Sequence, residues 1–174
     1  MQLTLNASEP LSTDAAFQVA ESLMESGQQS LATELLQFVT RNNHDDQSVA
    51  ERAQKVFESG GMGDAGRELL TASRKEAAEA MTEGVKLISQ GELAAALDSM
   101  RRARTLMPQN SRAQLNLAFV AVTILEKTGW DAGLAQEART AISAAQGITP
   151  GNARAAELHG RLQKATEAAA KPAS

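Results

Sequence analysis

Small and turn-forming residues recur along this chain at alternating spacings of seven and five residues, and this pattern constrains the fold most. Its clearest copy runs through Gly84, Gly91, Ala96, Ala103 and Pro108. Small residues are required where two antiparallel helices approach closely, glycine permits a tight turn, and proline ends a helix. The pattern therefore predicts helix–turn–helix repeats stacked side by side.

The same pattern returns in further windows of the sequence. Its members there are Ala20, Gly27, Ala32, Val39 and His44; Gln54, Gly61, Gly66 and Ser73; Ala118, Ala138, Ala145 and Pro150; and Gly160. The composition agrees, because only 3% of the 174 residues are aromatic and no long β-branched alternating run occurs. A core of Leu, Ala, Met and Val suits closely packed helices better than a β-sandwich, so we predict an all-α fold.

The repeats organise the chain into one helical domain at 14–168, between a flexible tail or linker at 1–13 and a disordered tail at 169–174. The predicted parts of that domain are degenerate repeats at 14–45 and 46–76, the best repeat at 77–110, an extended repeat at 111–150 and a capping helix at 152–168. Asp46, Asn110 and Asn152 occupy the same place in successive repeats and are residue types that cap helix N-termini. Their recurrence supports the register of the stack.

The spacing of the repeated pattern changes at two places, and each change predicts a local feature of the fold. Eleven residues separate Ser73 from Gly84, where a regular repeat gives fifteen, and no Pro, Asn or Asp interrupts 66–90. We therefore expect one long helix at about 64–90, with a kink near Ser73 or Gly84 as the alternative. The second departure is an expansion of eight residues between Pro108 and Pro150, about two helical turns shared between the two helices of that repeat.

The expanded repeat turns at KTGWDAG, where Gly129 should end one helix and Asp131 should cap the next. Trp130 lies at the tip of this turn. It is either a hydrophobic staple across the turn or an exposed anchor for a partner, since tryptophan is enriched in binding hot spots.

The segment EGVKLISQGELAAALDSMRRARTLMPQN resembles the tetratricopeptide repeat, matching both glycines, both alanines and the closing proline of that family's pattern. The segment lacks the large aromatic residues that the family prefers at three positions, which hold Ala80, Leu87 and Met100. The resemblance implies an α-solenoid of antiparallel helix pairs, about four repeats long with a C-terminal capping helix, that binds other proteins.

In that register the first helix of each pair lines the concave wall, and the predicted partner-binding groove follows from it. Its expected residues are Met81, Val85, Arg112, Leu115, Asn116, Phe119, Val122, Arg154 and Arg161. An apolar floor with basic and amide edges would accept an amphipathic helix or an extended, acidic segment. The alternative is that Leu115, Phe119 and Val122 pack between neighbouring helices.

A related groove in this family clamps the terminal carboxylate of a chaperone. Asn116 and Arg154 match two of its positions, whereas Met81, Val85 and Leu158 occupy positions that require Lys, Asn and Arg. The sequence therefore disfavours such a clamp and favours a groove that is apolar and basic.

A second resemblance concerns a larger architecture. The run LATELLQFVTRNNHDDQSVAERAQKVFESGGMG, then GRELLTASRKE and TGWDAGLAQEAR, is similar to the C-terminal region of bacterial response regulators that join a receiver domain to these repeats. It implies a cytoplasmic output arm of two-component signalling, and a receiver domain cannot fit within the first thirteen residues. The alternatives are an adaptor outside two-component signalling, or a structural module that self-associates as a homodimer through 158–170.

Other function classes find little support in the sequence. Net charge is −4, and Arg101, Arg102 and Arg104 form the only tight basic cluster, with no aromatic residue beside it. We therefore expect no nucleic-acid partner. The sequence has no cysteine, two distant histidines, and no apolar run long enough for a membrane. We expect no catalytic residue, metal or cofactor, hence not an enzyme, and no membrane contact.

Overall fold

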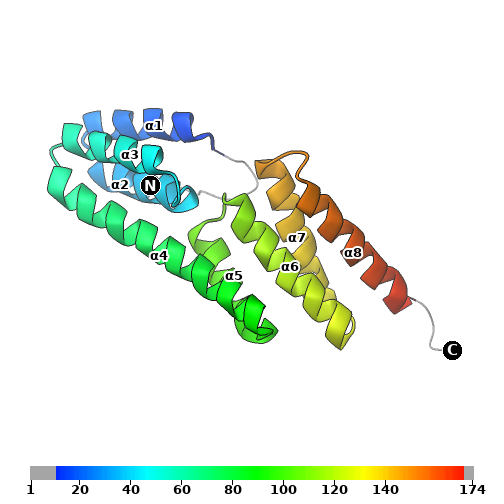
Figure 1. The fold of residues 1–174 in the computed structure, drawn as a ribbon. Helices are drawn as coiled ribbons and strands as arrows, with labels where there is room; N and C mark the ends of the chain where they lie inside the picture. The colour runs from blue at the N-terminus through cyan, green and yellow to red at the C-terminus, as the bar shows by residue number, and fades with distance from the viewer. Residues whose placement is uncertain (1–10, 171–174) are drawn as a thin grey trace. The chain divides into compact units, whose positions relative to one another are not determined.

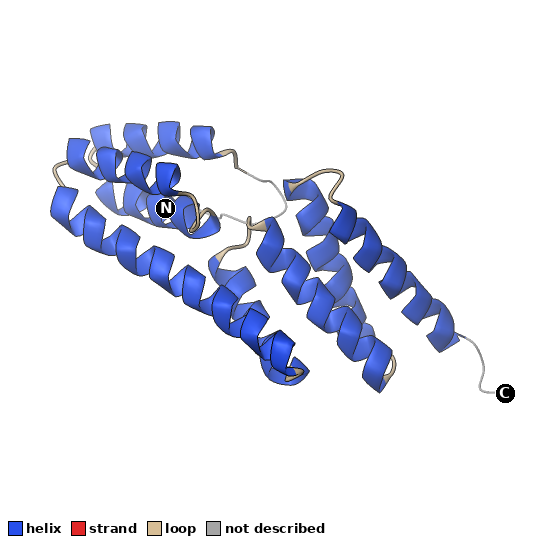
Figure 2. Ribbon diagram, in the orientation of Figure 1, coloured by secondary structure: helices blue, strands red, loops and turns tan. Residues whose placement is uncertain are grey.

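The computed structural model describes residues 11–170, and every regular element in that range is an α-helix (Figures 1 and 2). The helices are α1 (Thr13–Glu25), α2 (Gln29–Asn42), α3 (Gln47–Ser59), α4 (Gly63–Gln90), α5 (Leu93–Leu106), α6 (Ser111–Thr128), α7 (Ala132–Ile148) and α8 (Ala153–Ala170). The predicted all-α class is confirmed, and the long helix expected at about 64–90 is α4.

Four of the helices begin at predicted capping residues whose side chains bond to free backbone amides of the first turn. The Asp46 carboxylate accepts hydrogen bonds from the amides of Ser48 and Val49, at 2.8 and 3.4 Å. The side-chain oxygens of Asn110, Asp131 and Asn152 each accept one from the amide three residues ahead. All four predicted caps are therefore present, and they start α3, α6, α7 and α8.

Glycines make the turns between paired helices because their backbone adopts positive φ angles. Gly27 lies between α1 and α2 with φ of 76°, and Gly91 lies between α4 and α5 with φ of 78°. Gly129 ends α6 with φ of 100°, as predicted. These angles strain any residue that carries a Cβ.

The structure divides into two compact units, an N-terminal unit (1–79) and a C-terminal unit (80–174), and the boundary falls inside α4. In the N-terminal unit α1, α2 and α3 contact one another. The segment of α4 in this unit lies so close to α3 that a Cβ added at Gly66 would be 2.3 Å from the Phe57 ring. The largest fully buried side chains in this unit are Phe17, Leu35, Leu36 and Phe57.

In the C-terminal unit α6 is central, because it contacts α5, α7 and α8. Its neighbours present mainly alanine to the interior, such as Ala96 on α5 and Ala138 on α7. A Cβ at Gly84 would be 2.3 Å from the tip of Met100, so the segment of α4 in this unit approaches α5 closely. Small residues therefore lie at close helix contacts in both units, as the sequence pattern predicts.

The predicted tails at 1–13 and 169–174 lie largely outside the described residues. Within that range, Ser12 caps α1, which begins at Thr13, and α8 continues to Ala170. Across 11–170 no helix is both long and apolar enough to cross a membrane.

Candidate functional site

The candidate site is a surface of the C-terminal unit formed by α6 and α8. We call it the α6–α8 face and define it by Phe119, Thr123 and Glu126 on α6 and by Arg154 and Arg161 on α8. The two helices contact each other directly. Phe119, Thr123 and Glu126 follow one another at spacings of four and three residues, which places them on one side of a helix.

Phe119 is the centre of this face. Phe119 is partly buried, and two guanidinium groups lie near its ring, Arg154 at 5.7 Å and Arg161 at 5.3 Å from the ring centroid. At these distances each cation is attracted to the electron-rich face of the ring. The result is a partly exposed aromatic surface bordered by positive charge.

Arg161 is held in place by hydrogen bonds to α6. Its Nε and one terminal nitrogen donate to the Glu126 carboxylate at 2.9 and 2.6 Å, and the same terminal nitrogen donates to the Thr123 hydroxyl at 3.2 Å. The bond from Arg161 lowers the pKa of Glu126, and the reciprocal bond raises the pKa of Arg161. Glu126 therefore neutralises Arg161, while Arg154 is exposed and contacts the Phe119 ring.

The other predicted groove residues are distributed differently. Met81, Leu115, Asn116 and Val122 are buried, and Val122 has no exposed surface. Val85 on α4 is 49% exposed, and Arg112 is exposed near the start of α6. Burial of Leu115 and Val122 is what packing between neighbouring helices requires, because α6 is covered by helices on several sides.

Trp130 is 39% exposed and lines a hollow next to the α6–α8 face. The hollow has a volume of about 470 Å³, and we call it the Trp130 pocket. Its lining residues are Leu125, Glu126, Gly129, Trp130, Arg161, Lys164, Ala165, Ala168 and Ala169. Glu126 and Arg161 belong to both features, so the aromatic and basic face is continuous with an apolar pocket.

Sequence reasoning identified Arg161 but not the other residues on the α8 side of this pocket. Arg161, Lys164, Ala165 and Ala168 recur at spacings of three and four residues, the signature of one helical side. That signal was present in the sequence, but alanine-rich helix ends also occur where no pocket exists.

The chemistry of the site suits a partner that presents apolar and acidic groups. The Trp130 pocket can bury an apolar side chain, and Arg154 and Lys164 can each pair with a carboxylate. Among the described residues no group of three or more His, Cys, Asp or Glu is arranged to hold a metal ion.

Comparisons with known proteins identify no relative of this chain. No protein-family model, no curated protein and no solved structure matches this chain. The resemblances to tetratricopeptide repeats and to response regulators therefore remain predictions from the sequence.

Proposed function

We propose that this chain is a protein–protein interaction module that binds a partner through the α6–α8 face and the Trp130 pocket. The single observation that carries the proposal is Phe119, an aromatic side chain that is only partly buried and has two arginine guanidinium groups over its ring. Aromatic and arginine side chains dominate the energy of protein interfaces.

The partner is a peptide segment or amphipathic helix that carries acidic groups next to a large apolar side chain. The basic groups Arg154 and Lys164 favour acidic groups, and the Trp130 pocket favours an apolar anchor. The paired helices support a stack of about four tetratricopeptide-like repeats, with α8 as the capping helix.

In the cell we place this module at the output end of a bacterial two-component response regulator, in the cytoplasm. The support for this is the sequence resemblance to the region that follows a receiver domain in such proteins. An adaptor unrelated to two-component signalling would use the same surface. We assign the chain a binding role and no catalytic role.

The test replaces Phe119 by glutamate and measures capture of a partner. Immobilised wild type and Phe119→Glu are incubated with bacterial lysate, and enriched proteins are identified by mass spectrometry. We expect a protein that is enriched on wild type and lost, by at least about tenfold, on Phe119→Glu, since a hot-spot residue contributes about 2 kcal/mol or more.

Ser143→Glu is the matched control, because Ser143 is exposed on α7 and the variant adds the same charge. It should capture the partner as wild type does. Equal capture by Phe119→Glu and wild type would contradict the proposed surface. Loss of helical circular dichroism in Phe119→Glu would instead assign Phe119 to the core.

A further inference from the structure

The α6–α8 face and the Trp130 pocket together form one groove, which we call the α6–α8 groove, and its parts follow one another in a fixed order. Arg154 contacts Phe119 at one end. Arg161 bonds to Glu126 in the middle, and Ala165 lines the Trp130 pocket at the other end. Residue numbers rise together on α6 and α8 in these contacts, so the two helices run parallel.

The groove has unneutralised cations at its two ends but not in its middle. Arg154 at one end and Lys164 at the rim of the Trp130 pocket form no ion pair with any residue in 11–170. Between them, the hydrogen bond to Glu126 and, less strongly, the charge of Glu157 raise the pKa of Arg161. Two acids therefore accompany the one arginine in the middle. An acidic group of a partner is attracted to the ends and not to the middle.

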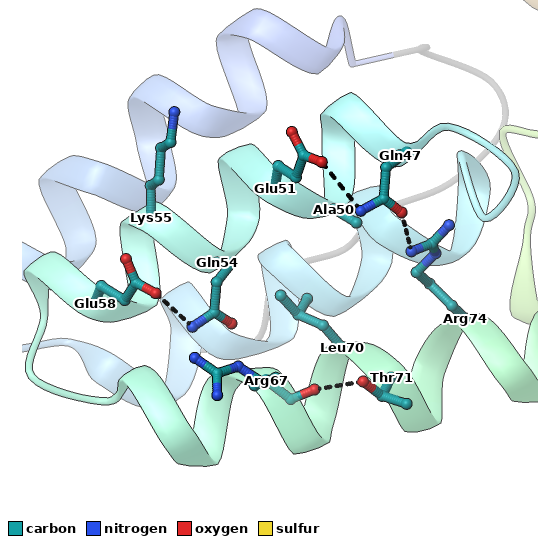
Figure 3. A pocket seen from close by; sticks show the side chains of 10 residues that line it. All are labelled: Gln47, Ala50, Glu51, Gln54, Lys55, Glu58, Arg67, Leu70, Thr71 and Arg74. Atoms are coloured by element: carbon teal, nitrogen blue, oxygen red, sulfur yellow. Dashed lines mark hydrogen bonds between the residues drawn. The ribbon is translucent and has the colours of Figure 1, made fainter.

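The hollow between α3 and α4 in the N-terminal unit lacks such an order (Figure 3). Its volume is about 430 Å³, similar to that of the Trp130 pocket. The charged residues that line it are Glu51, Lys55, Glu58, Arg67 and Arg74. A lysine lies between the two glutamates on α3, so acids and bases are mixed. This lining therefore selects neither an acidic nor a basic partner.

The surroundings of the α6–α8 groove favour a helix as its occupant. A three-residue turn joins α6 to α7, so α7 runs antiparallel to α6, and it contacts both α6 and α8. One helix therefore already lies along one side of this pair. At the pocket end of the groove, α8 presents only small apolar residues, Ala165, Ala168 and Ala169. Small side chains allow a second helix to approach closely, because the distance between helix axes depends on the side chains at the contact.

The positions on α8 set the spacing that such a helix needs. Arg161 follows Arg154 by seven residues and Ala165 follows it by eleven. These separations correspond to about 10.5 and 16.5 Å along a helix. A helix alongside α8 has the same rise per residue, so its positions n, n+7 and n+11 lie level with these three residues in either direction. Eleven residues make about three turns, which places all three positions on one side of the partner helix.

We propose that the partner is an amphipathic helix with an acidic residue at position n, an uncharged residue at n+7 and a large apolar residue at n+11. The acid pairs with Arg154, and the uncharged residue covers the pair of Glu126 and Arg161. The apolar residue enters the Trp130 pocket, where a neighbouring acid pairs with Lys164. This inference rests on the proposed function and specifies the partner that the function leaves open.

Trp130 supplies the readout of the test, because it is the only tryptophan in a chain without tyrosine. The probe is a helical peptide of about 20 residues, built from alanine and glutamine, with glutamate at n and leucine at n+11. It contains no aromatic residue and is made in both directions. We expect a saturable change in Trp130 emission with one of the two peptides, because the leucine side chain replaces water beside the indole ring.

Two control probes test the spacing and the helix separately on the wild-type chain. The first has its glutamate at n+7, four positions from the leucine, which brings the carboxylate next to Glu126. We expect it to bind at least about tenfold more weakly, because like charges then meet. The second keeps the glutamate and leucine in place but has a proline midway between them, which breaks the helix. We expect no saturable change with this peptide.

Arg154→Glu tests the acidic end of the partner. We expect the probe to bind this variant at least about tenfold more weakly, because two acids are brought together. Binding should return when lysine replaces the glutamate of the probe. The matched control, Arg139→Glu, makes the same change at an exposed position on α7 and should bind the original probe as wild type does. The circular dichroism of both variants should match that of wild type.

Three results would overturn the inference. One is the absence of a saturable change in wild type with either direction of the probe up to about 1 mM, where a millimolar Kd is detectable. The others are equal affinity for a control probe, and unchanged binding by Arg154→Glu. Each differs from failure of the proposed function, in which Phe119→Glu captures the same lysate proteins as wild type. Capture that is lost in Phe119→Glu, together with any of the three results, would retain the binding role and reject the helix.

Discussion

Two phenylalanines in this chain make the same kind of contact but differ in exposure. In the N-terminal unit the Arg52 guanidinium lies 4.4 Å from the Phe17 ring centroid, and Phe17 is completely buried. In the C-terminal unit Arg154 lies over Phe119, which is only partly buried. The contact between Arg52 and Phe17 is explained by packing within the N-terminal unit. The remaining exposure of Phe119 is what makes it a candidate for binding.

The site residues were only partly predictable, for a geometric reason. The repeat register identified Phe119, Arg154 and Arg161, which the structure brings together. It also selected Leu115 and Val122, which are buried. A helix covered by several neighbours has a wide apolar surface, so periodicity alone cannot distinguish a residue that faces a groove from one that faces the next helix.

The basic cluster on α5 has a structural partner. Arg101 binds the Glu137 carboxylate through Nε at 3.1 Å and through a terminal nitrogen at 2.7 Å, and Arg104 lies 3.5 Å from the same carboxylate. The bonds from Arg101 lower the pKa of Glu137 below its ordinary value of 4.5. These contacts give Arg101 and Arg104 an acidic partner within the C-terminal unit.

We predict that Glu137→Gln destabilises the protein by about 1–2 kcal/mol at pH 7, because it replaces charge-assisted hydrogen bonds of a largely buried carboxylate. The folded pKa of Glu137 is lowered, so its contribution is complete above pH 4.5. It is lost as the pH falls through the folded pKa. Urea unfolding of both proteins between pH 7 and pH 3 measures the difference, which should shrink below pH 4.5. A difference that is constant over this range would contradict the assignment.

At the scale of the helix, the sequence predicted the elements well because their ends carry local signals. The helical domain was expected from residue 14, and α1 begins at Thr13. The long helix was expected at about 64–90, and α4 spans Gly63–Gln90. Capping side chains and turn glycines act within one turn of the backbone. Their effect therefore does not depend on the rest of the fold.

The glycines inside helices are of two kinds. A Cβ at Gly66 would lie 2.3–2.7 Å from Cβ and ring atoms of Phe57, which is fully buried and cannot move aside. A Cβ at Gly160 on α8 would meet nothing within 4 Å. Both positions belong to the repeated pattern of small residues, but only the contact between α3 and α4 requires glycine.

We predict opposite effects of one substitution at these two positions. Gly66→Ala should destabilise the protein by about 1–2 kcal/mol, because overpacking outweighs the higher helix propensity of alanine. Gly160→Ala should stabilise it by about 0.5–1 kcal/mol, because the gain in propensity meets no clash. Urea denaturation followed by circular dichroism measures both variants against wild type. Stabilisation by Gly66→Ala would show that α3 and α4 do not approach this closely.

For the whole molecule, the same contact between helices recurs in both units. Arg52 follows Phe17 by 35 residues, and Arg154 follows Phe119 by 35 residues. Each arginine reaches back from the first helix of one pair to the first helix of the preceding pair. This spacing supports internal repetition, which the small-residue pattern also predicts.

The division into two units was not predictable from that pattern. The boundary lies within α4, which carries no turn signal between Asp64 and Gln90. A unit is defined by how densely its residues contact one another, and a continuous helix can belong to two units. The identity of a partner is equally absent from the fold, because a few exposed side chains determine what a helical surface binds.

The most direct test of the central claim locates the partner on the surface of the chain. A photo-crosslinking amino acid, p-benzoylphenylalanine, replaces Arg154 on the α6–α8 face or Ser143 on α7, and the full chain is irradiated in bacterial cells. We predict a discrete crosslinked protein from position 154, absent from position 143 and abolished when Phe119→Glu is added. Crosslinks of equal yield from both positions, or a product at 154 that survives Phe119→Glu, would contradict binding through the α6–α8 face.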